Sequence, residues 1–216
     1  MAIPSDVVTL SFTASETIQS PTVTASSGGA AVNGNVSVSY TSGNSWTASF
    51  TANANDTAGP VTYSITFSDT AGNAGTPVTS TTDSSNVAVI IDSELPILLS
   101  STPSDGSRAV KLDQNIVLKF SEAVTAGSGK INLFDASGEL VEAFNVSPSI
   151  ISSATVTLNP SADFASRSAY YIQIPSTAFV DAAGNGYAGI SNKTGLDFVT
   201  LDVNAPSLIS LSLIHI

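Results

Sequence analysis

The chain has 216 residues, of which 42% are hydrophobic and only 11% are charged, and it carries a net charge of −11 at pH 7. This hydrophobic fraction excludes an intrinsically disordered chain, and the length suits two domains of about 100 residues each. The 6 Lys and Arg residues all lie beyond residue 107, so an acidic surface without a basic patch argues against nucleic acid as a partner.

Hydrophobic residues alternate with Thr, Ser or Lys, which is typical of antiparallel strands with one buried and one solvated face. The alternation runs through residues 8–12, 36–40, 46–50 and 61–67, and then through 116–120, 154–158 and 170–174. Gly, Asn, Asp and Pro clusters interrupt it about every 8 to 12 residues, as in a Greek-key β-sandwich. No stretch has helical periodicity over three turns, so the sequence predicts an all-β chain.

Aromatic residues add detail to this prediction. Residues 56–63 and 163–170 each resemble the loop and tyrosine of a tyrosine corner, with Tyr63 and Tyr170 as the tyrosines. Trp46 is expected at the centre of the first core, whereas Tyr171 and Tyr187 are the expected exposed aromatic side chains.

Three features occur twice in the same order, which indicates one module used twice. They are a Phe followed by Ser-Glu, an Asp-x-x-Gly-Asn turn, and an Asp followed by Pro four residues later. The sequence therefore predicts module 1 at 1–92, module 2 at 93–203 and the start of a third repeat at 204–210. The repeated pairs are Phe12 to Glu16 and Phe120 to Glu122, Asp69 to Asn73 and Asp181 to Asn185, and Asp92 to Pro96 and Asp202 to Pro206.

Residues 211–216 depart from the repeat. The codons CTG-TCT-CTT-ATA-CAC-ATC would encode them, and this string resembles the transposase end used in DNA library preparation. We interpret the segment as an adapter-derived artefact; the alternative is a natural strand of a third module. The only His of the chain, His215, lies in this segment.

The motifs resemble bacterial Ig-like repeats of large surface adhesins, on residues 9–16, 46–48, 68–73 and 89–92. The second module is similar to the SbsA-type bacterial Ig-like domain, on residues 96–106, 118–131, 170–172, 179–185 and 197–198. The resemblance implies two tandem Ig-like Greek-key β-sandwiches. It implies no single function, because such modules serve as stalks, as surface-layer parts and as spacers beside enzymes.

The sequence contains no Cys, and without His215 it contains no His. Serine and cysteine triads and the usual zinc ligands are therefore missing, and we expect no enzyme. Paired carboxylates of the glycosidase kind remain open by composition, although the acidic residues recur between modules as architectural residues would. No segment reaches the roughly 20 apolar residues that span a membrane, so we expect no membrane insertion in this fragment.

Calcium is the one metal that the sequence suggests, because it binds carboxylate, amide and backbone oxygens. The two Asp-x-x-Gly-Asn turns, the two linker Asp residues and two Glu residues after early strands supply such oxygens. The alternative for each turn is that Asp caps its own backbone while Asn adopts a left-handed conformation. The candidate ligands are Asp92, Asp202, Asp69, Asn73, Asp181, Asn185, Glu16 and Glu122.

These observations predict a structural spacer or stalk repeat of a secreted bacterial cell-surface protein, an adhesin, with calcium as a stiffening ion. Its expected partners are neighbouring Ig-like repeats of the same chain, and its expected location is extracellular or on the cell surface. The alternatives are a carbohydrate- or surface-binding module and an accessory domain of a secreted hydrolase. Residues 1–6 have no signal-peptide features, so an export signal would lie outside this segment.

Overall fold

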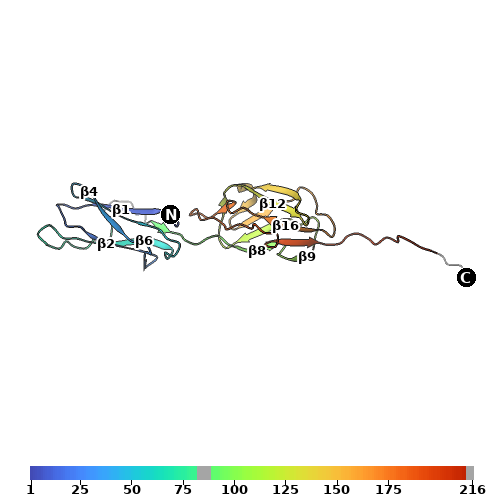
Figure 1. The fold of residues 1–216 in the computed structure, drawn as a ribbon, viewed down its shortest axis with the longest axis horizontal. Helices are drawn as coiled ribbons and strands as arrows, with labels where there is room; N and C mark the ends of the chain where they lie inside the picture. Colours follow the sequence, from blue (N-terminus) through green and yellow to red (C-terminus); the bar gives the residue numbers. More distant parts are fainter. Residues whose placement is uncertain (82–88, 213–216) are drawn as a thin grey trace. The chain divides into compact units, whose positions relative to one another are not determined.

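The computed structural model describes residues 1–81 and 89–212. It divides into unit 1, formed by Met1–Leu95 with Ala183–Asn185, and unit 2, formed by Pro96–Ala182 with Gly186–Ile216. Apart from one 3-10 turn at Pro148–Ile150, the described elements are all β-strands (Figure 1). The all-β prediction is therefore confirmed. Residues 213–216 of the suggested adapter segment lie outside the described residues.

Unit 1 is a sandwich of two sheets. The three-stranded sheet has the order β1 (Val7–Thr13), β5 (Ser45–Thr51) and β4 (Ser37–Ser42). The four-stranded sheet has the order β3 (Ala30–Ala31), β2 (Thr22–Ser27), β6 (Gly59–Thr66) and β7 (Ile90–Ile91). Its core consists of two small clusters of buried side chains, which include Phe50, Ile91 and Ile65.

Unit 2 contains two larger sheets and one short two-stranded pair. The first sheet has the order β14 (Ile151–Ser152), β15 (Thr155–Leu158), β10 (Ile116–Phe120) and β8 (Leu98–Thr102). The second has the order β13 (Leu140–Asn145), β12 (Lys130–Asp135), β16 (Ala169–Gln173), β18 (Asp197–Thr200) and β9 (Ser107–Val110). The pair joins β11 (Thr125–Ala126) to β17 (Phe179–Val180).

The alternation in the sequence produces the unit 2 core directly. Along β10, the side chains of Ile116, Leu118 and Phe120 are buried, whereas Lys119 is exposed. These three side chains join one continuous buried cluster with residues of β12, β15, β16 and β18. Burying apolar surface contributes about 25 cal/mol per Å², so among the described residues this large cluster contributes more stabilisation than either small cluster of unit 1.

Trp46 departs from its predicted place. It is only half-buried and is not among the side chains of the unit 1 clusters or those packed against them. Its ring lies edge-on to Tyr40, with the two ring centroids 5.5 Å apart. The prediction of a central core role was wrong because the alternation places Trp46 on the inward face of β5 but at the end of that strand.

In both units the last strand pairs in parallel with the first part of the unit. In unit 1, Ala2 forms a parallel bridge with Ile91. In unit 2, β9 pairs in parallel with β18, with Ser107 opposite Phe198 and Val110 opposite Thr200. The two strands of a parallel pair run in one direction, so in unit 2 the start of β9 and the end of β18 lie at opposite ends of their pairing.

The predicted tyrosine corner is present in unit 2. The backbone N–H of Ala165 donates a hydrogen bond of 2.9 Å to the Tyr170 hydroxyl. The Tyr170 ring packs between Phe164 and Phe198, at centroid distances of 5.0 Å and 5.6 Å. One side chain therefore fixes the 163–168 loop to the buried cluster.

Replacing Tyr170 with Phe removes the acceptor of the Ala165 N–H while keeping the ring. We expect a loss of about 1 kcal/mol in the free energy of unfolding, the usual worth of one such hydrogen bond. Urea denaturation measures it. Tyr171→Phe is the matched control, because no hydrogen bond of that hydroxyl is found within residues 1–81 and 89–212; an equal loss in both variants would contradict the role of the corner.

Candidate functional site

The predicted linker carboxylates lie where each unit ends. Asp92 Oδ1 accepts a hydrogen bond of 3.2 Å from the Glu94 backbone N–H, and Asp202 Oδ1 accepts one of 3.0 Å from Asn204 N–H. Each Asp therefore caps a turn that begins at its own position, and the two linkers share one local geometry.

Asp69 and Asn73 lie together in the first Asp-x-x-Gly-Asn turn. Asp69 Oδ1 accepts from Asn73 N–H at 2.8 Å, and Asp69 Oδ2 accepts from Asn73 Nδ2 at 2.7 Å. The Asn73 side chain, followed by its backbone N–H, lowers the pKa of the Asp69 carboxyl. Gly72 adopts a φ of 94°, which favours glycine at this position. This is the Asp-capped turn that was the alternative to a metal ligand, but the left-handed conformation expected at Asn73 is adopted by Gly72 instead.

The second turn has the same sequence pattern but different surroundings. Asp181 and Asn185 are both buried, whereas Asn73 is exposed. Asn185 belongs with unit 1, and its Nδ2 donates a 3.2 Å hydrogen bond to the Asp92 carbonyl oxygen. The structure thus brings the side chain of Asn185, a turn residue, to the backbone of Asp92, a predicted linker residue.

The remaining candidates are two glutamates. Glu16 is exposed and Glu122 is half-buried. Among the residues that the structure describes, no group of three or more His, Cys, Asp or Glu side chains is close enough to hold a metal ion. Calcium at the eight candidate residues stays a prediction.

Asp56 is a buried carboxylate that the sequence analysis did not single out. It is 3% exposed, and it accepts hydrogen bonds from Asn33 N–H at 2.7 Å, Asn33 Nδ2 at 3.1 Å and Asn53 N–H at 2.8 Å. Burial alone would raise the pKa of this carboxyl, but the hydrogen bonds outweigh burial and the pKa lies below its ordinary value. An Asn three residues before an Asp, in a loop between two strands, was the available signal.

The loop of Asp56 also holds the end of unit 1. Ser93 Oγ donates a 3.1 Å hydrogen bond to the Asp56 carbonyl oxygen. Ser27 Oγ donates to the Thr57 carbonyl oxygen at 2.7 Å. We call residues 53–59 of unit 1 and 163–168 of unit 2 the corner loops.

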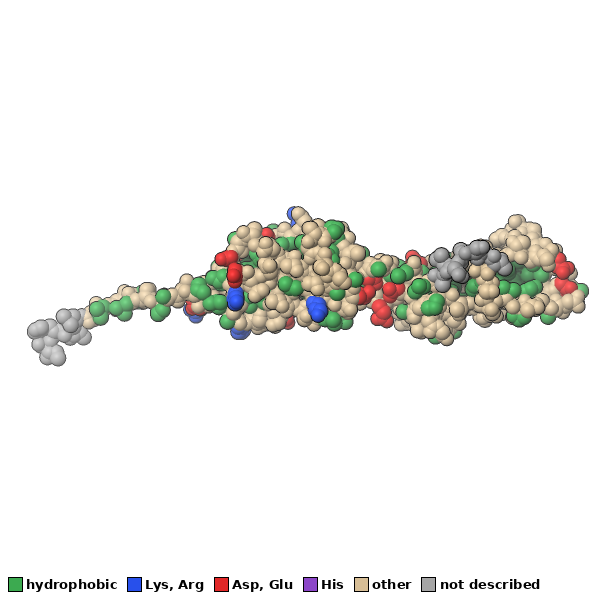
Figure 2. Space-filling view, turned by 180° about the vertical axis from the view of Figure 1, so that it is seen from behind, with side chains coloured by type: hydrophobic (Ala, Val, Ile, Leu, Met, Phe, Trp, Pro, Cys, Tyr) green, Lys and Arg blue, Asp and Glu red, His purple; other side chains and the backbone are tan. Residues whose placement is uncertain are grey.

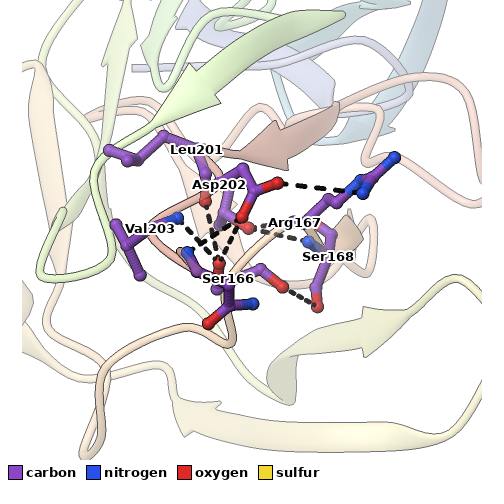
Figure 3. A network of polar contacts seen from close by, with 8 residues as sticks. Ser166, Arg167, Ser168, Leu201, Asp202 and Val203 are labelled. Atoms are coloured by element: carbon purple, nitrogen blue, oxygen red, sulfur yellow. Dashed lines mark hydrogen bonds and ion pairs between the residues drawn. The ribbon is translucent and has the colours of Figure 1, made fainter. Parts of the chain in front are cut away.

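The corner loop of unit 2 holds the outgoing chain through more contacts (Figure 3). Arg167 N–H donates to the Leu201 carbonyl oxygen at 3.0 Å, and Val203 N–H donates to Ser166 Oγ at 3.0 Å. The Arg167 guanidinium lies 3.8 Å from Asp202 Oδ2, but both side chains are exposed, so this ion pair adds little stability. The backbone bonds, rather than the ion pair, fix the outgoing segment.

The aromatic residues expected on the surface are buried. Tyr171 is 6% exposed and stacks on Phe134, and Tyr187 is 7% exposed and packs edge-on against Phe120. Burial raises the pKa of the Tyr187 hydroxyl. That prediction was wrong, because the position of a tyrosine in the strand alternation does not reveal what covers the outer face. Tyr40 is instead 58% exposed, beside the half-buried Trp46.

No titratable side chain lines the groove of about 430 Å³ between β13 and β15. Its lining combines Phe144, Ile150, Ile151 and Leu158 with uncharged Ser, Thr and Asn side chains. Uncharged polar side chains and backbone also dominate the face seen in Figure 2, where the Lys and Arg side chains lie over unit 2 only. No helix of residues 1–81 and 89–212 is long and apolar enough to cross a membrane.

Comparison with known proteins gives one family match. The model of the bacterial Ig-like domain matches residues 92–200. Among solved structures, 22 chains match. One of them is the crystal structure of DIP-gamma IG1+IG2, which is 12% identical with a TM-score of 0.37 over 92% of this chain and 91% of that chain. No curated protein matches the chain.

Replacing Asp56 with Ala leaves the N–H groups of Asn33 and Asn53 without their acceptor. We expect a loss of about 1.5 to 3 kcal/mol in the free energy of unfolding at pH 7, the usual contribution of hydrogen bonds to a charged group. Because the folded pKa of Asp56 is lowered, the difference in the free energy of unfolding between wild type and Asp56→Ala is fully present above the unfolded pKa of about 3.9. The difference disappears as the pH falls through the folded pKa.

Denaturant unfolding at several pH values measures this difference. Asp163→Ala is the matched control, because Asp163 opens the other corner loop, is exposed and makes no side-chain hydrogen bond within the described ranges. If the difference in the free energy of unfolding between wild type and Asp56→Ala stays constant down to pH 2, the role of the carboxylate is contradicted.

Proposed function

The chain belongs to the bacterial Ig-like domain family, and from this we propose that it is a structural spacer repeat of a secreted bacterial cell-surface protein, an adhesin stalk. Its partners are neighbouring Ig-like repeats of the same chain, and its location is extracellular. In this proposal it performs no catalysis, which agrees with the lack of Cys and with a single His at position 215.

One observation carries the proposal. In unit 1 the last strand, β7, forms a single parallel bridge with Ala2, and in unit 2 the last strand, β18, runs parallel to the second strand, β9. A module of this kind passes the chain from one end to the other, and copies joined in series add length. A module whose chain begins and ends at the same end would add little.

The corner loops give a second argument. Each one binds the segment that leaves its unit, through Ser93 in unit 1 and through Leu201 and Val203 in unit 2. Ordering a linker residue costs about 1 to 2 kcal/mol of backbone entropy, and these bonds offset part of that cost. The direction in which the chain leaves each unit is therefore fixed locally, as a spacer requires.

A spacer must grow in proportion to its copy number. We expect the maximum dimension of residues 1–203, joined head to tail in one, two and three copies, to increase linearly in small-angle X-ray scattering. Growth with only the cube root of mass, as for a compact globule, would contradict the proposal. A specific hit on a glycan array, lost in Tyr40→Ala but not in Tyr171→Phe, would favour the carbohydrate-binding alternative instead.

We also propose that the carboxylates at the ends of the units bind calcium. It is supported by the recurrence of Asp92 and Asp202 and by the approach of Asn185 to the Asp92 carbonyl oxygen. An ion that binds only the folded chain must stabilise it. We expect millimolar calcium to raise the melting temperature above that in a chelator, and Asp92→Asn with Asp202→Asn to abolish the rise. Equal melting curves would remove calcium from the proposal.

A further inference from the structure

We propose that Asn33 is a site of slow, irreversible self-modification, at which the backbone nitrogen of Gly34 converts the side-chain amide to a carboxylate. The conversion loosens the corner loop of unit 1, because Asn33 supplies two of the hydrogen bonds that hold the buried Asp56. The inference concerns unit 1 alone and is independent of the proposed spacer function.

The reaction needs only these two neighbours and water. The Gly34 nitrogen attacks Cγ of Asn33, an N–Cγ bond forms, and the side-chain nitrogen leaves as ammonia with the proton of the Gly34 N–H. Water then opens the succinimide ring at one of its two carbonyl carbons. Opening at Cγ gives aspartate, and opening at the main-chain carbon gives isoaspartate, in which the main chain runs through Cγ.

The position of the pair in the fold favours ring formation. Asn33 and Gly34 form a bend between β3 and β4, outside both strands, and Asn33 is exposed to water. Glycine has no side chain to shield its nitrogen, and its backbone is the least restricted. Within residues 1–81 and 89–212 no acceptor is found for the Gly34 N–H. The attacking nitrogen therefore breaks no hydrogen bond there when it reacts.

A second Asn-Gly pair in the chain lies in different surroundings. Asn185 is 4% exposed, and Gly186 forms an antiparallel bridge with Val180. A ring can form at this pair only after a buried turn opens, and such local opening costs free energy. We therefore expect Asn33 to react ahead of Asn185, which serves as a control within the same molecule.

Conversion turns the attraction between Asn33 and Asp56 into repulsion. Asn33 Nδ2 donates to the Asn55 carbonyl oxygen at 2.7 Å and to Asp56 Oδ1 at 3.1 Å. A carboxylate at position 33 has no proton to donate, and it places a second negative charge beside Asp56. Burial raises the pKa of the Asp56 carboxyl, and the bonds from Asn33 and Asn53 now outweigh burial. Conversion removes part of that compensation.

The loss reaches the rest of the corner loop through its carbonyl groups. Ser93 Oγ donates to the Asp56 carbonyl oxygen, and Ser27 Oγ donates to the Thr57 carbonyl oxygen. Both acceptors lie in the segment that the Asp56 side chain holds in place. A chemical change at the exposed bend therefore weakens the attachment of the segment that follows β7.

Mass spectrometry of the full chain, kept folded in warm, mildly alkaline buffer, tests the conversion. Peptic digestion gives the peptides, because no Lys or Arg lies within residues 1–107 for trypsin to use. We expect Asn33 to gain the mass of an amide-to-acid change well before Asn185. In urea the two should react at similar rates. Equal rates in the folded chain, or an Asn33 that stays intact there, would overturn the proposal.

Two variants identify the attacking nitrogen. Gly34→Ala shields it and should slow the conversion of Asn33 several-fold. A Cβ at Gly34 would lie 3.1 Å from the Thr51 carbonyl oxygen, so Asn33→Gln is the second variant, which keeps the amide but requires a larger ring. Conversion at the wild-type rate in either variant would refute attack by the Gly34 nitrogen.

Asn33→Asp reproduces one product and isolates its effect on the loop. We expect a lower urea midpoint than in wild type and a higher pKa of Asp56, followed by NMR, because like charges disfavour ionisation. Asn35→Asp is the matched control, because it adds the same charge at an exposed residue whose side chain makes no hydrogen bond within the described ranges. Equal midpoints in the two variants would show that conversion does not loosen the corner loop.

Discussion

The parallel contact between the first segment and the last strand is the constraint on which the rest of each unit depends. In unit 2 it places the start of β9 and the end of β18 at opposite ends of one ladder, and in unit 1 it is a single bridge between Ala2 and Ile91. The two sheets then lie on either side of a core to which Ile91 or Phe198 contributes from that last strand. The corner loops fix the segment that follows the last strand, because they form hydrogen bonds with it just beyond that strand.

Much of this architecture follows from the sequence pattern. The alternation at 116–120 predicts a strand with a buried face, and Ile116, Leu118 and Phe120 are buried as expected. The tyrosine corner at Tyr170 was also predictable, because its loop and tyrosine have a recognisable spacing. Both features are local, so a single stretch of sequence contains the information that defines them.

The failures concern information that is not local. The alternation gives the face on which Trp46, Tyr171 or Tyr187 lies, but not whether a neighbouring element covers that face. The two Asp-x-x-Gly-Asn turns share a pattern, yet Asp69 and Asn73 cap each other at the surface while Asp181 and Asn185 are buried. Asp56 has one local partner, Asn53, but its other partner, Asn33, belongs to a different loop, which the sequence pattern does not reveal.

The uneven distribution of basic residues has a consequence for survival in the proposed extracellular location. Secreted proteases whose specificity pocket requires Lys or Arg beside the cut bond find no such bond within residues 1–107. Among the residues that the structure describes, the buried clusters of unit 1 are smaller than the one of unit 2. An opened segment without Lys or Arg still offers these enzymes nothing to cleave, so it can refold before the chain is cut. The composition of unit 1 thus protects this module against one class of protease.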